Sequence, residues 1–334
     1  MNKGITFAGN ILVDVVKTIS GYPQPGMLAN ITAVSQAVGG CVPNTAIDVA
    51  KMDPSMPIAA YGRVGDDAYG QYVTGQMAAH GIDVTHVQIT REAPTSFSDV
   101  MSDVASGERT FFHARGANAY FAPADVDVET LDCRIFHIGY ILLLDKMDEA
   151  DEKYGTALAG LLAQVQAKGI KTSIDVVSDS TGRFREKIVP ALRYCDYAIM
   201  NEIEGCGVSG LEPRNPDGSI CVENIRTTME QMLSMGVRDR VILHSKEGGF
   251  MLTADGQFRY APAIDIAPEQ IAGKVGAGDA FCAGCLYGLH NSMDDEALLP
   301  FASAAAACNL TAADSVSGMR SAEAVSAIAA AGRI

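Results

Sequence analysis

Stretches with the composition of β-strands alternate with stretches of helical periodicity along most of this chain. The predicted strand and helix pairs are 5–9 with 43–52, 58–61 with 68–80, 135–141 with 153–168, and 170–176 with 184–192. Further on, a strand at 197–200 precedes a loop and a helix at 223–235, and a strand at 241–243 precedes a hairpin over 250–260. Such alternation is typical of an α/β fold in which helices cover both faces of a mostly parallel sheet. Ligands of such sheets usually bind at the carboxyl ends of the strands.

Two β-rich segments, roughly 13–38 and 84–115, interrupt this alternation. Thr, Val, Ser and Phe dominate them and helical periodicity is weak, so they predict extra strands. We favour a small β-lid over the reaction site, because a closed lid excludes water, although a plain surface extension would look the same in sequence. The last third is predicted to be helical at 279–289, 302–310 and 322–331. Since no Gly/Ser/Pro-rich linker divides the chain, we expect residues 1–334 to form a single domain.

The formal net charge of −15 argues against functions that need a basic surface. An acidic surface repels phosphate backbones and anionic membranes, and the chain contains no run of Lys and Arg that would offset this charge. We therefore expect neither a nucleic acid nor a membrane as partner. The first residues lack the pattern of a secretory signal, and no stretch approaches the roughly 18 apolar residues of a membrane span, which predicts a cytoplasmic protein.

The eight cysteines predict neither a disulfide framework nor a zinc site, because they are scattered and form no paired CxxC sets. Cys282 and Cys285 make a single CxxC inside a predicted helix, and we interpret them as small buried apolar groups rather than a redox or metal site. An anionic ligand would then depend on backbone amides, a helix amino end or a metal ion.

A glycine-rich segment, Gly276-Ala277-Gly278-Asp279, stands directly before a helical pattern. Glycines at this place let successive backbone N–H groups point outward, and the helix dipole adds partial positive charge there. The segment is therefore suited to hold a phosphoryl group. The Asp279 carboxylate is suited to accept a proton from an attacking hydroxyl, or it caps the helix, and the local sequence leaves both interpretations open.

The segment GAGDAFCAGCLYGL at 276–289 resembles the second signature of the ribokinase-like (PfkB) carbohydrate kinases, whose pattern is close to D-T-x-G-A-G-D-x-F. Residues 39–46 resemble the family's first signature, 201–204 its N-x-x-E motif and 62–70 a further family stretch, so the match runs from about 4 to 330. The resemblance implies a three-layer α/β/α domain with a β-lid. It also implies ATP-dependent phosphorylation of a primary hydroxyl on a sugar or sugar-like acceptor, with Mg²⁺.

The resemblance assigns roles by position. Asp279 would be the general base, and Gly276, Ala277 and Gly278 would form the anion hole that holds the transferring phosphoryl group. The residues that would hold substrate hydroxyls are Asp14, Gly39, Gly40 and Asn44. A carboxylate and an amide suit neighbouring hydroxyls, and paired glycines allow close approach to the backbone, although such a pair alone would be an ordinary turn.

Asn201 and Glu204 follow the predicted strand at 197–200. By resemblance Glu204 would orient magnesium-bound water and Asn201 would lie near the phosphates. Mg²⁺ prefers carboxylate, water and phosphate oxygens, so one glutamate with retained waters is reasonable. The alternative is a solvated acid in a loop.

Gly273-Lys274 replaces the family's Asp-Thr pair, which helps to form a monovalent-cation site in many relatives. Losing that carboxylate should weaken K⁺ binding, so we expect activity to be largely independent of K⁺. Lys274 either places an ammonium near the vacated position or points to solvent.

The nucleotide side also departs from the family. Ser245 stands where the usual Thr-x-Gly has glycine, ahead of Gly248, and Ser303 occupies a helix position that is often Asn near the adenine. We predict that Ser245, Gly248, Ser303 and Asn201 contact nucleotide, but these changes leave the phosphate donor open. His244 either contacts nucleotide or is a partly exposed loop histidine, the interpretation we prefer.

The acceptor depends on the lid, where residues 107–111 (GERTF) resemble the lid hairpin of several sugar kinases. Arg115 is predicted to bind a carboxylate or hydroxyl of the acceptor, or is a surface charge. The expected partners are a small-molecule sugar and ATP, with a homodimer through the lid as a further possibility. Two alternatives remain open: a nucleoside kinase of the same fold, and a non-catalytic sugar-binding relative. A dinucleotide oxidoreductase lacks support, because no GxGxxG follows the first strand.

Overall fold

The computed structural model describes residues 3–103, 109–178 and 182–334. Its centre is a nine-stranded sheet in which seven strands run parallel to one another. In spatial order the strands are β15 (Phe258–Pro262), β14 (Gly248–Thr253), β13 (Arg240–Ser245), β12 (Tyr197–Asn201), β11 (Lys171–Val176), β8 (Cys133–Ile141), β1 (Gly4–Gly9), β4 (Ile58–Gly65) and β5 (Val87–Thr90). Strands β14 and β15 extend one edge of this sheet through antiparallel pairs. The predicted mostly parallel α/β sheet is confirmed.

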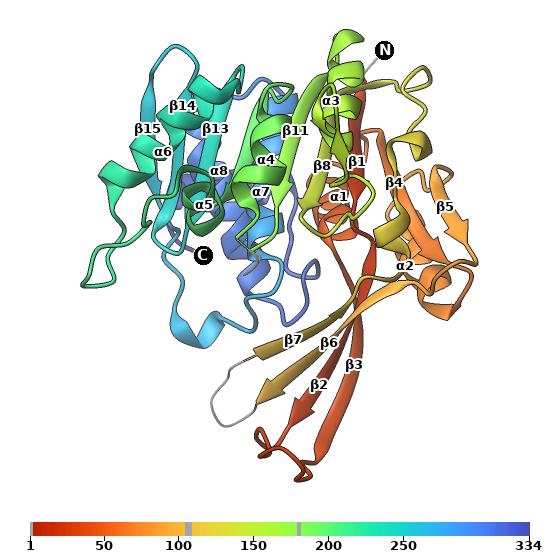
Figure 1. Ribbon diagram of the computed structural model, residues 1–334. Helices are drawn as coiled ribbons and strands as arrows, with labels where there is room; N and C mark the ends of the chain where they lie inside the picture. The colour runs from red at the N-terminus through yellow and green to blue at the C-terminus, as the bar shows by residue number, and fades with distance from the viewer. Residues whose placement is uncertain (1–2, 104–108, 179–181) are drawn as a thin grey trace.

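Helices cover both faces of this sheet (Figure 1). One layer contains α3 (Ala157–Ala167), α4 (Phe184–Leu192), α5 (Glu202–Ser209) and α6 (Val222–Met235). The other contains α1 (Cys41–Met52), α2 (Ala68–Ala79), α7 (Ala277–His290), α8 (Asp295–Leu310) and α9 (Ala322–Ala331). Among the helices of the described residues, none has the length and apolar character needed to cross a membrane.

The hydrophobic core is divided by the sheet into two clusters, because successive side chains of a strand point to opposite faces. Phe7 belongs to the cluster on the α1 and α7 side, whereas Ala8 belongs to the one on the α3 and α4 side. Ile199 and Met200 in β12 divide in the same way. Burial on both faces explains why the strands appear in the sequence as continuous apolar runs.

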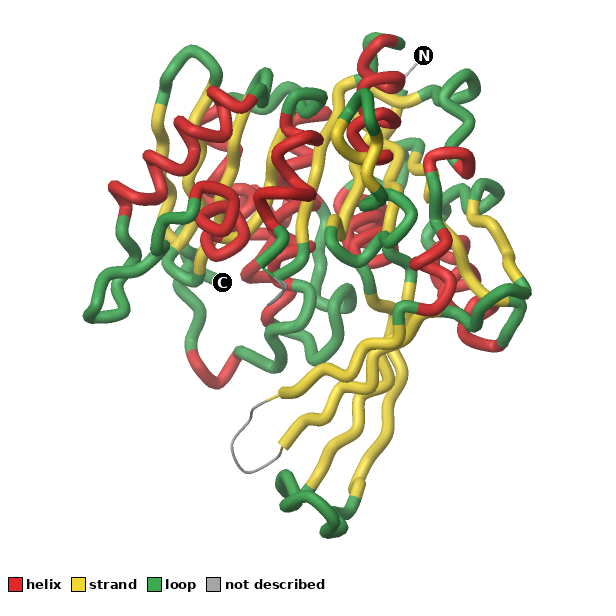
Figure 2. Tube along the Cα trace, in the orientation of Figure 1, coloured by secondary structure: helices red, strands yellow, loops and turns green. Residues whose placement is uncertain are grey.

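A separate four-stranded sheet, here called the lid sheet, projects from the body (Figures 1 and 2). Its order is β3 (Ile31–Gly39), β2 (Leu12–Ile19), β6 (Ser96–Asp103) and β7 (Arg109–Ala114). The predicted segment 13–38 supplies two of these strands. The other predicted segment, 84–115, includes β6 and β7 but also β5, which is not a lid strand because it pairs with β4 at the edge of the central sheet. Strand composition alone does not show to which sheet a strand belongs.

Three further predictions of secondary structure were wrong in part. The loop expected after β12 contains α5, a short glycine-containing helix with little periodicity of its own. The helix expected over 153–168 begins only at Ala157, after a two-stranded ribbon of β9 (Ala150–Asp151) and β10 (Gly155–Thr156). Helix α8 begins at Asp295 rather than at 302. It contains Pro300, and a proline in a sequence is usually taken to end or break a helix, so the sequence prediction began too late.

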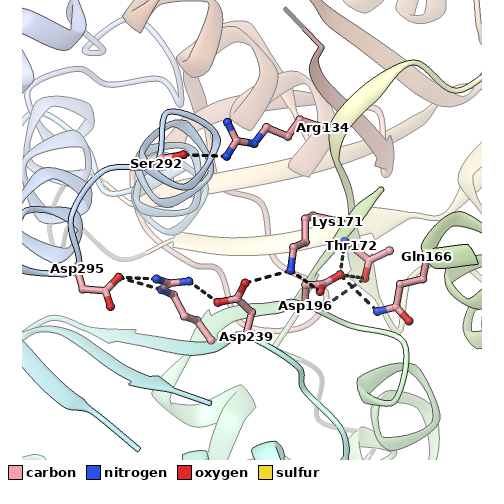
Figure 3. A network of polar contacts seen from close by, with 9 residues as sticks. Arg134, Gln166, Lys171, Thr172, Asp196, Asp239, Ser292 and Asp295 are labelled. Atoms are coloured by element: carbon pink, nitrogen blue, oxygen red, sulfur yellow. Dashed lines mark hydrogen bonds and ion pairs between the residues drawn. The ribbon is translucent and has the colours of Figure 1, made fainter. Parts of the chain in front are cut away.

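An ion-pair network lies at the amino ends of β11, β12 and β13, the edge opposite to the expected ligand side (Figure 3). Lys171 pairs with Asp196 and Asp239 at 2.9 and 3.2 Å, and Arg240 pairs with Asp239 and, at 2.7 Å, with Asp295 at the start of α8. These contacts tie α8 to the sheet. Because each of these charges has a partner of opposite sign, we interpret this network as structural.

Candidate active site

A cavity of about 750 Å³ opens at the carboxyl ends of the parallel strands, between the body and the lid sheet. Ten of the predicted site residues line it: Asp14, Gly40, Asn44, Arg115, Asn201, Glu204, Gly276, Ala277, Gly278 and Asp279. The topology therefore brings together residues from both ends of the chain. Gly39, Ser245, Gly248 and Ser303 are not among the residues lining this cavity.

The glycine-rich segment forms the amino end of α7. Gly276 is the N-cap residue and has a left-handed backbone with φ 79°, a conformation that favours glycine. The first hydrogen bond of the helix runs from Ala280 N to Gly276 O at 2.8 Å, so the amides of Ala277, Gly278 and Asp279 precede the helical ladder. These three N–H groups and the helix dipole create a site suited to an anion.

Asp279 is 5% exposed and its carboxylate accepts hydrogen bonds from other elements. Asn44 Nδ2 in α1 donates to Oδ2 at 2.8 Å, and the Tyr140 hydroxyl donates to both oxygens at 2.8 Å. These bonds link Asp279 to side chains of α1 and β8, which does not support the helix-cap interpretation. Burial raises the pKa of Asp279, while the bonds from Asn44 and Tyr140 lower it by favouring the ionised form.

Asp14 lies in the lid strand β2 and is 8% exposed. Burial and the nearby Asp279 charge raise its pKa to about 7, and a hydrogen bond from Ser98 lowers it. Gly39 lies against this carboxyl: a Cβ there would be 2.6 Å from Asp14 Oδ2. Gly40 follows with φ 87° at the start of α1, and a Cβ there would be 2.6 Å from Asn10 O. Glycine is thus required at 39 by packing against Asp14, and at 40 by the positive φ and by packing against Asn10.

Asn201 and Glu204 cap α5 reciprocally. Asn201 Oδ1 accepts from Glu204 N at 2.8 Å, and Glu204 Oε2 accepts from Asn201 N at 2.9 Å, which is a capping box. Glu204 is 5% exposed, so the solvated-loop interpretation is wrong. Burial raises its pKa to about 7, although the bonds from Asn201 and Ser178 oppose the rise.

Arg115 lies where the lid sheet joins the body. Its Nη1 donates to Asp145 Oδ1 at 2.6 Å and to Leu142 O at 3.2 Å, so its charge is already partly neutralised. Arg115 lines the cavity and its role in acceptor binding stays a prediction. Of the GERTF hairpin, Gly107 and Glu108 lie outside the described residues.

The predicted nucleotide residues are scattered. Ser245 Oγ accepts from Glu247 N at 3.2 Å in the turn after β13. Gly248 has φ 146° and packs against Ala261, which fits a hairpin role, and Ser303 is buried in α8. His244, expected in a loop, lies in β13 and lines the cavity, with its ring 5.0 Å from that of Phe281.

Two residues that sequence reasoning missed also line the cavity, Tyr140 near the end of β8 and Asp175 near the end of β11. Burial, with the Glu204 and Asp279 charges nearby, raises the pKa of Asp175 well above its usual value. Their position at the carboxyl ends of parallel strands is a signal that could have marked them.

Lys274 is exposed and lines the cavity beside the amino end of α7. Within the described parts of the chain, no carboxylate lies at ion-pair distance from its ammonium group, whereas Arg115 has one. The cavity also contains the carboxyls of Asp14, Asp175, Glu204 and Asp279. Lys274 thus adds a positive charge to a predominantly acidic cavity.

Comparison with known proteins agrees with this geometry. The model of the pfkB family carbohydrate kinases matches residues 3–322. A probable fructokinase-7 of Arabidopsis thaliana is 24% identical over 332 residues, covering 95% of this chain and 90% of that protein. Ribokinase of Staphylococcus aureus is 23% identical over 298 residues, covering 88% and 89%. The structure of Arabidopsis thaliana ribokinase complexed with ribose and ATP has a TM-score of 0.80 at 20% identity, covering 98% of this chain and 99% of that one, which confirms the fold.

Proposed function

Because this chain belongs to the pfkB family of carbohydrate kinases, we propose that it transfers the γ-phosphoryl group of ATP to a primary hydroxyl of a sugar or sugar-like acceptor. The observation that carries the proposal is the buried Asp279 carboxylate at the amino end of α7, where three amides precede the helical ladder. The relatives named as a fructokinase and a ribokinase support a sugar as the acceptor class.

In the proposed reaction the acceptor oxygen attacks the γ-phosphorus, the bond from that phosphorus to the β-γ bridging oxygen of ATP breaks, and ADP leaves. Asp279 takes the proton of the hydroxyl, while the amides of Ala277, Gly278 and Asp279 stabilise charge on the transferring phosphoryl oxygens. Asp14 and Asn44 hold neighbouring acceptor hydroxyls. Asn44 and Tyr140 both donate to the Asp279 carboxylate and hold it in position before an acceptor binds.

Mg²⁺ fits the cavity through Glu204, whose two oxygens already accept bonds from Ser178 and Asn201 and would bind a magnesium water rather than the ion itself. When bound, Mg²⁺ neutralises charge on the phosphates. Asn201 would lie near those phosphates.

An acceptor screen tests this proposal. Purified protein is incubated with ATP and Mg²⁺ and a panel of sugars, sugar acids and nucleosides, and ADP release and thermal stabilisation are measured. We expect a sugar or sugar acid to stabilise the protein and to release ADP. Selective turnover of a nucleoside would establish the nucleoside-kinase alternative instead, and ligand stabilisation without ADP release would establish the binding-protein alternative.

We also propose that activity is largely independent of K⁺. The support is Gly273-Lys274 at the position of the family's Asp-Thr pair, together with the place of Lys274 on the cavity wall. Replacing K⁺ by tetramethylammonium at constant ionic strength is expected to leave kcat unchanged. A large loss of kcat in tetramethylammonium, restored by K⁺, would show that a cation site exists despite these changes.

A homodimer through the lid sheet is a further proposal. Strand β3 is an edge of that sheet, residues 31–36 in it are exposed, and Val34 is 63% exposed. An exposed apolar edge strand is a template for pairing with another chain. We expect Val34→Asp to lower the molar mass measured by light scattering to that of a monomer.

The matched control for this variant is Ile89→Asp, because Ile89 is 70% exposed on β5, the edge strand of the central sheet. It should leave the molar mass unchanged. A wild-type protein that is monomeric at every concentration would refute the lid dimer.

A further inference from the structure

The Tyr140 hydroxyl is hydrogen-bonded to the carboxylate of Asp279, the proposed base. Its oxygen lies 2.8 Å from both Asp279 Oδ1 and Oδ2, while Asn44 Nδ2 lies 2.8 Å from Oδ2. At these distances no water separates the phenol from the carboxylate. Tyr140 reaches Asp279 from the end of β8, and its side chain forms part of the cavity wall.

In this contact the Tyr140 hydroxyl takes the place beside Asp279 that an acceptor hydroxyl must reach. A general base must lie within about 2.6–3.2 Å of the hydroxyl whose proton it removes. Among the described residues, the Tyr140 hydroxyl is the only hydrogen-bond donor to Asp279 Oδ1. Any oxygen that is to react, from a sugar or from water, must therefore approach Asp279 alongside this phenol or displace it.

Water is the competing nucleophile at such a site. The Asp279 carboxylate adjoins the α7 amides that would hold the phosphoryl group, so a water bonded to Oδ1 would lie next to that group. Its oxygen would form the new bond to the γ-phosphorus, the bond to ADP would break, and Asp279 would take the proton, giving ADP and phosphate. A sugar has further hydroxyls with which to bind Asp14, whereas water has none.

We propose that Tyr140 is a positioning residue that covers Asp279 until an acceptor displaces its hydroxyl, and that it thereby suppresses hydrolysis of ATP by water. This inference rests on the proposed kinase activity. Tyr140 is part-buried and its side chain lines the cavity. An acceptor anchored at Asp14 would supply the binding energy for that displacement.

The test is Tyr140→Phe, which removes only the hydroxyl. The buried Oδ1 then lacks a donor, and a water is expected to take its place, because a buried carboxylate oxygen is costly to leave unpaired. The rate of ATP hydrolysis without acceptor should rise about tenfold. This rise is smaller than the rate enhancement of about 10²–10⁴-fold that a positioned general base can give. The double variant Tyr140→Phe/Asp279→Asn should return hydrolysis to the wild-type level. A purely structural loss would lower both hydrolysis and sugar phosphorylation rather than raise one of them.

Tyr287→Phe is the matched control, because Tyr287 is a part-buried tyrosine of α7 that stacks on Phe301 and is absent from the cavity lining. It should leave hydrolysis unchanged. If the Phe variant does not fold, Tyr140→Leu also lacks the hydroxyl and should give the same rise.

The outcomes separate this inference from the kinase proposal. Hydrolysis by Tyr140→Phe at the wild-type rate, in a protein whose wild type phosphorylates a sugar, would overturn the role of Tyr140 and leave the kinase proposal standing. A rise that persists in the double variant would also overturn it, since Asp279 would then not be the base for water. A wild type that consumes no ATP with any acceptor would overturn both.

Discussion

Asp279→Asn should lower kcat by about 10³-fold, since a positioned general base contributes about 10²–10⁴-fold. Asparagine has the size of aspartate and an oxygen that can still accept from Tyr140, so the fold of the site is retained, but it cannot take the acceptor's proton. The affinities for ATP and acceptor should therefore change little. Steady-state kinetics and calorimetric titration of both ligands measure the two effects separately.

Asp48→Asn is the matched control for this variant. Asp48 is a fully buried carboxyl of α1 that is not part of the cavity lining, and burial raises its pKa well above the usual value. Its replacement by a neutral amide should leave kcat unchanged. Equal loss in the two variants would mean that Asp279 acts through packing, and unchanged turnover in Asp279→Asn would show that Asp279 is not the base.

Asp14→Ala should lower kcat/KM for the acceptor by about 10²-fold, while the KM for ATP stays near its wild-type value. A hydrogen bond to a charged group contributes about 1.5–3 kcal/mol, and the larger value corresponds to about 10²-fold. Asp14 projects from β2 into the cavity, on the lid side of Asp279. The loss should therefore concern acceptor binding rather than nucleotide binding, which initial-rate kinetics with each substrate varied in turn will measure.

Asp99→Ala serves as the control within the lid sheet, since Asp99 lies in β6 beside Ser98, pairs with Lys17 and is not among the residues lining the cavity. It should leave kcat/KM for the acceptor unchanged. If Asp14→Ala raised the KM for ATP instead, the lid side of the cavity would hold the nucleotide and the orientation of the two substrates would be reversed.

The sequence was sufficient to predict the α/β sheet, the lid strands and ten of the residues that line the cavity, because strand periodicity and the glycine-rich signatures are local patterns. It was insufficient where an assignment depends on which strands are neighbours. β5 has the composition of a lid strand yet pairs with β4. Tyr140 and Asp279 are 139 residues apart, and only the place of β8 in the sheet brings them together.

Some of what was missed had a readable signal. The spacing of Asn201 and Glu204 is that of a capping box, which would have placed both residues at the start of a helix rather than in a loop. The partner of Arg115 had no such signal, because Asp145 lies 30 residues away in a loop whose path depends on tertiary packing. Arg115 could therefore be assigned to the site but its salt bridge could not be foreseen.

Transfer of the γ-phosphoryl group of ATP to an acceptor hydroxyl, with Asp279 as base, can be followed by phosphorus-31 NMR of the protein with ATP, Mg²⁺ and the sugar selected by the acceptor screen. We predict that a phosphomonoester signal coupled to methylene protons grows in step with ADP and is absent for Asp279→Asn over the same time. ADP accompanied only by inorganic phosphate, or an unchanged ATP spectrum, would contradict the account.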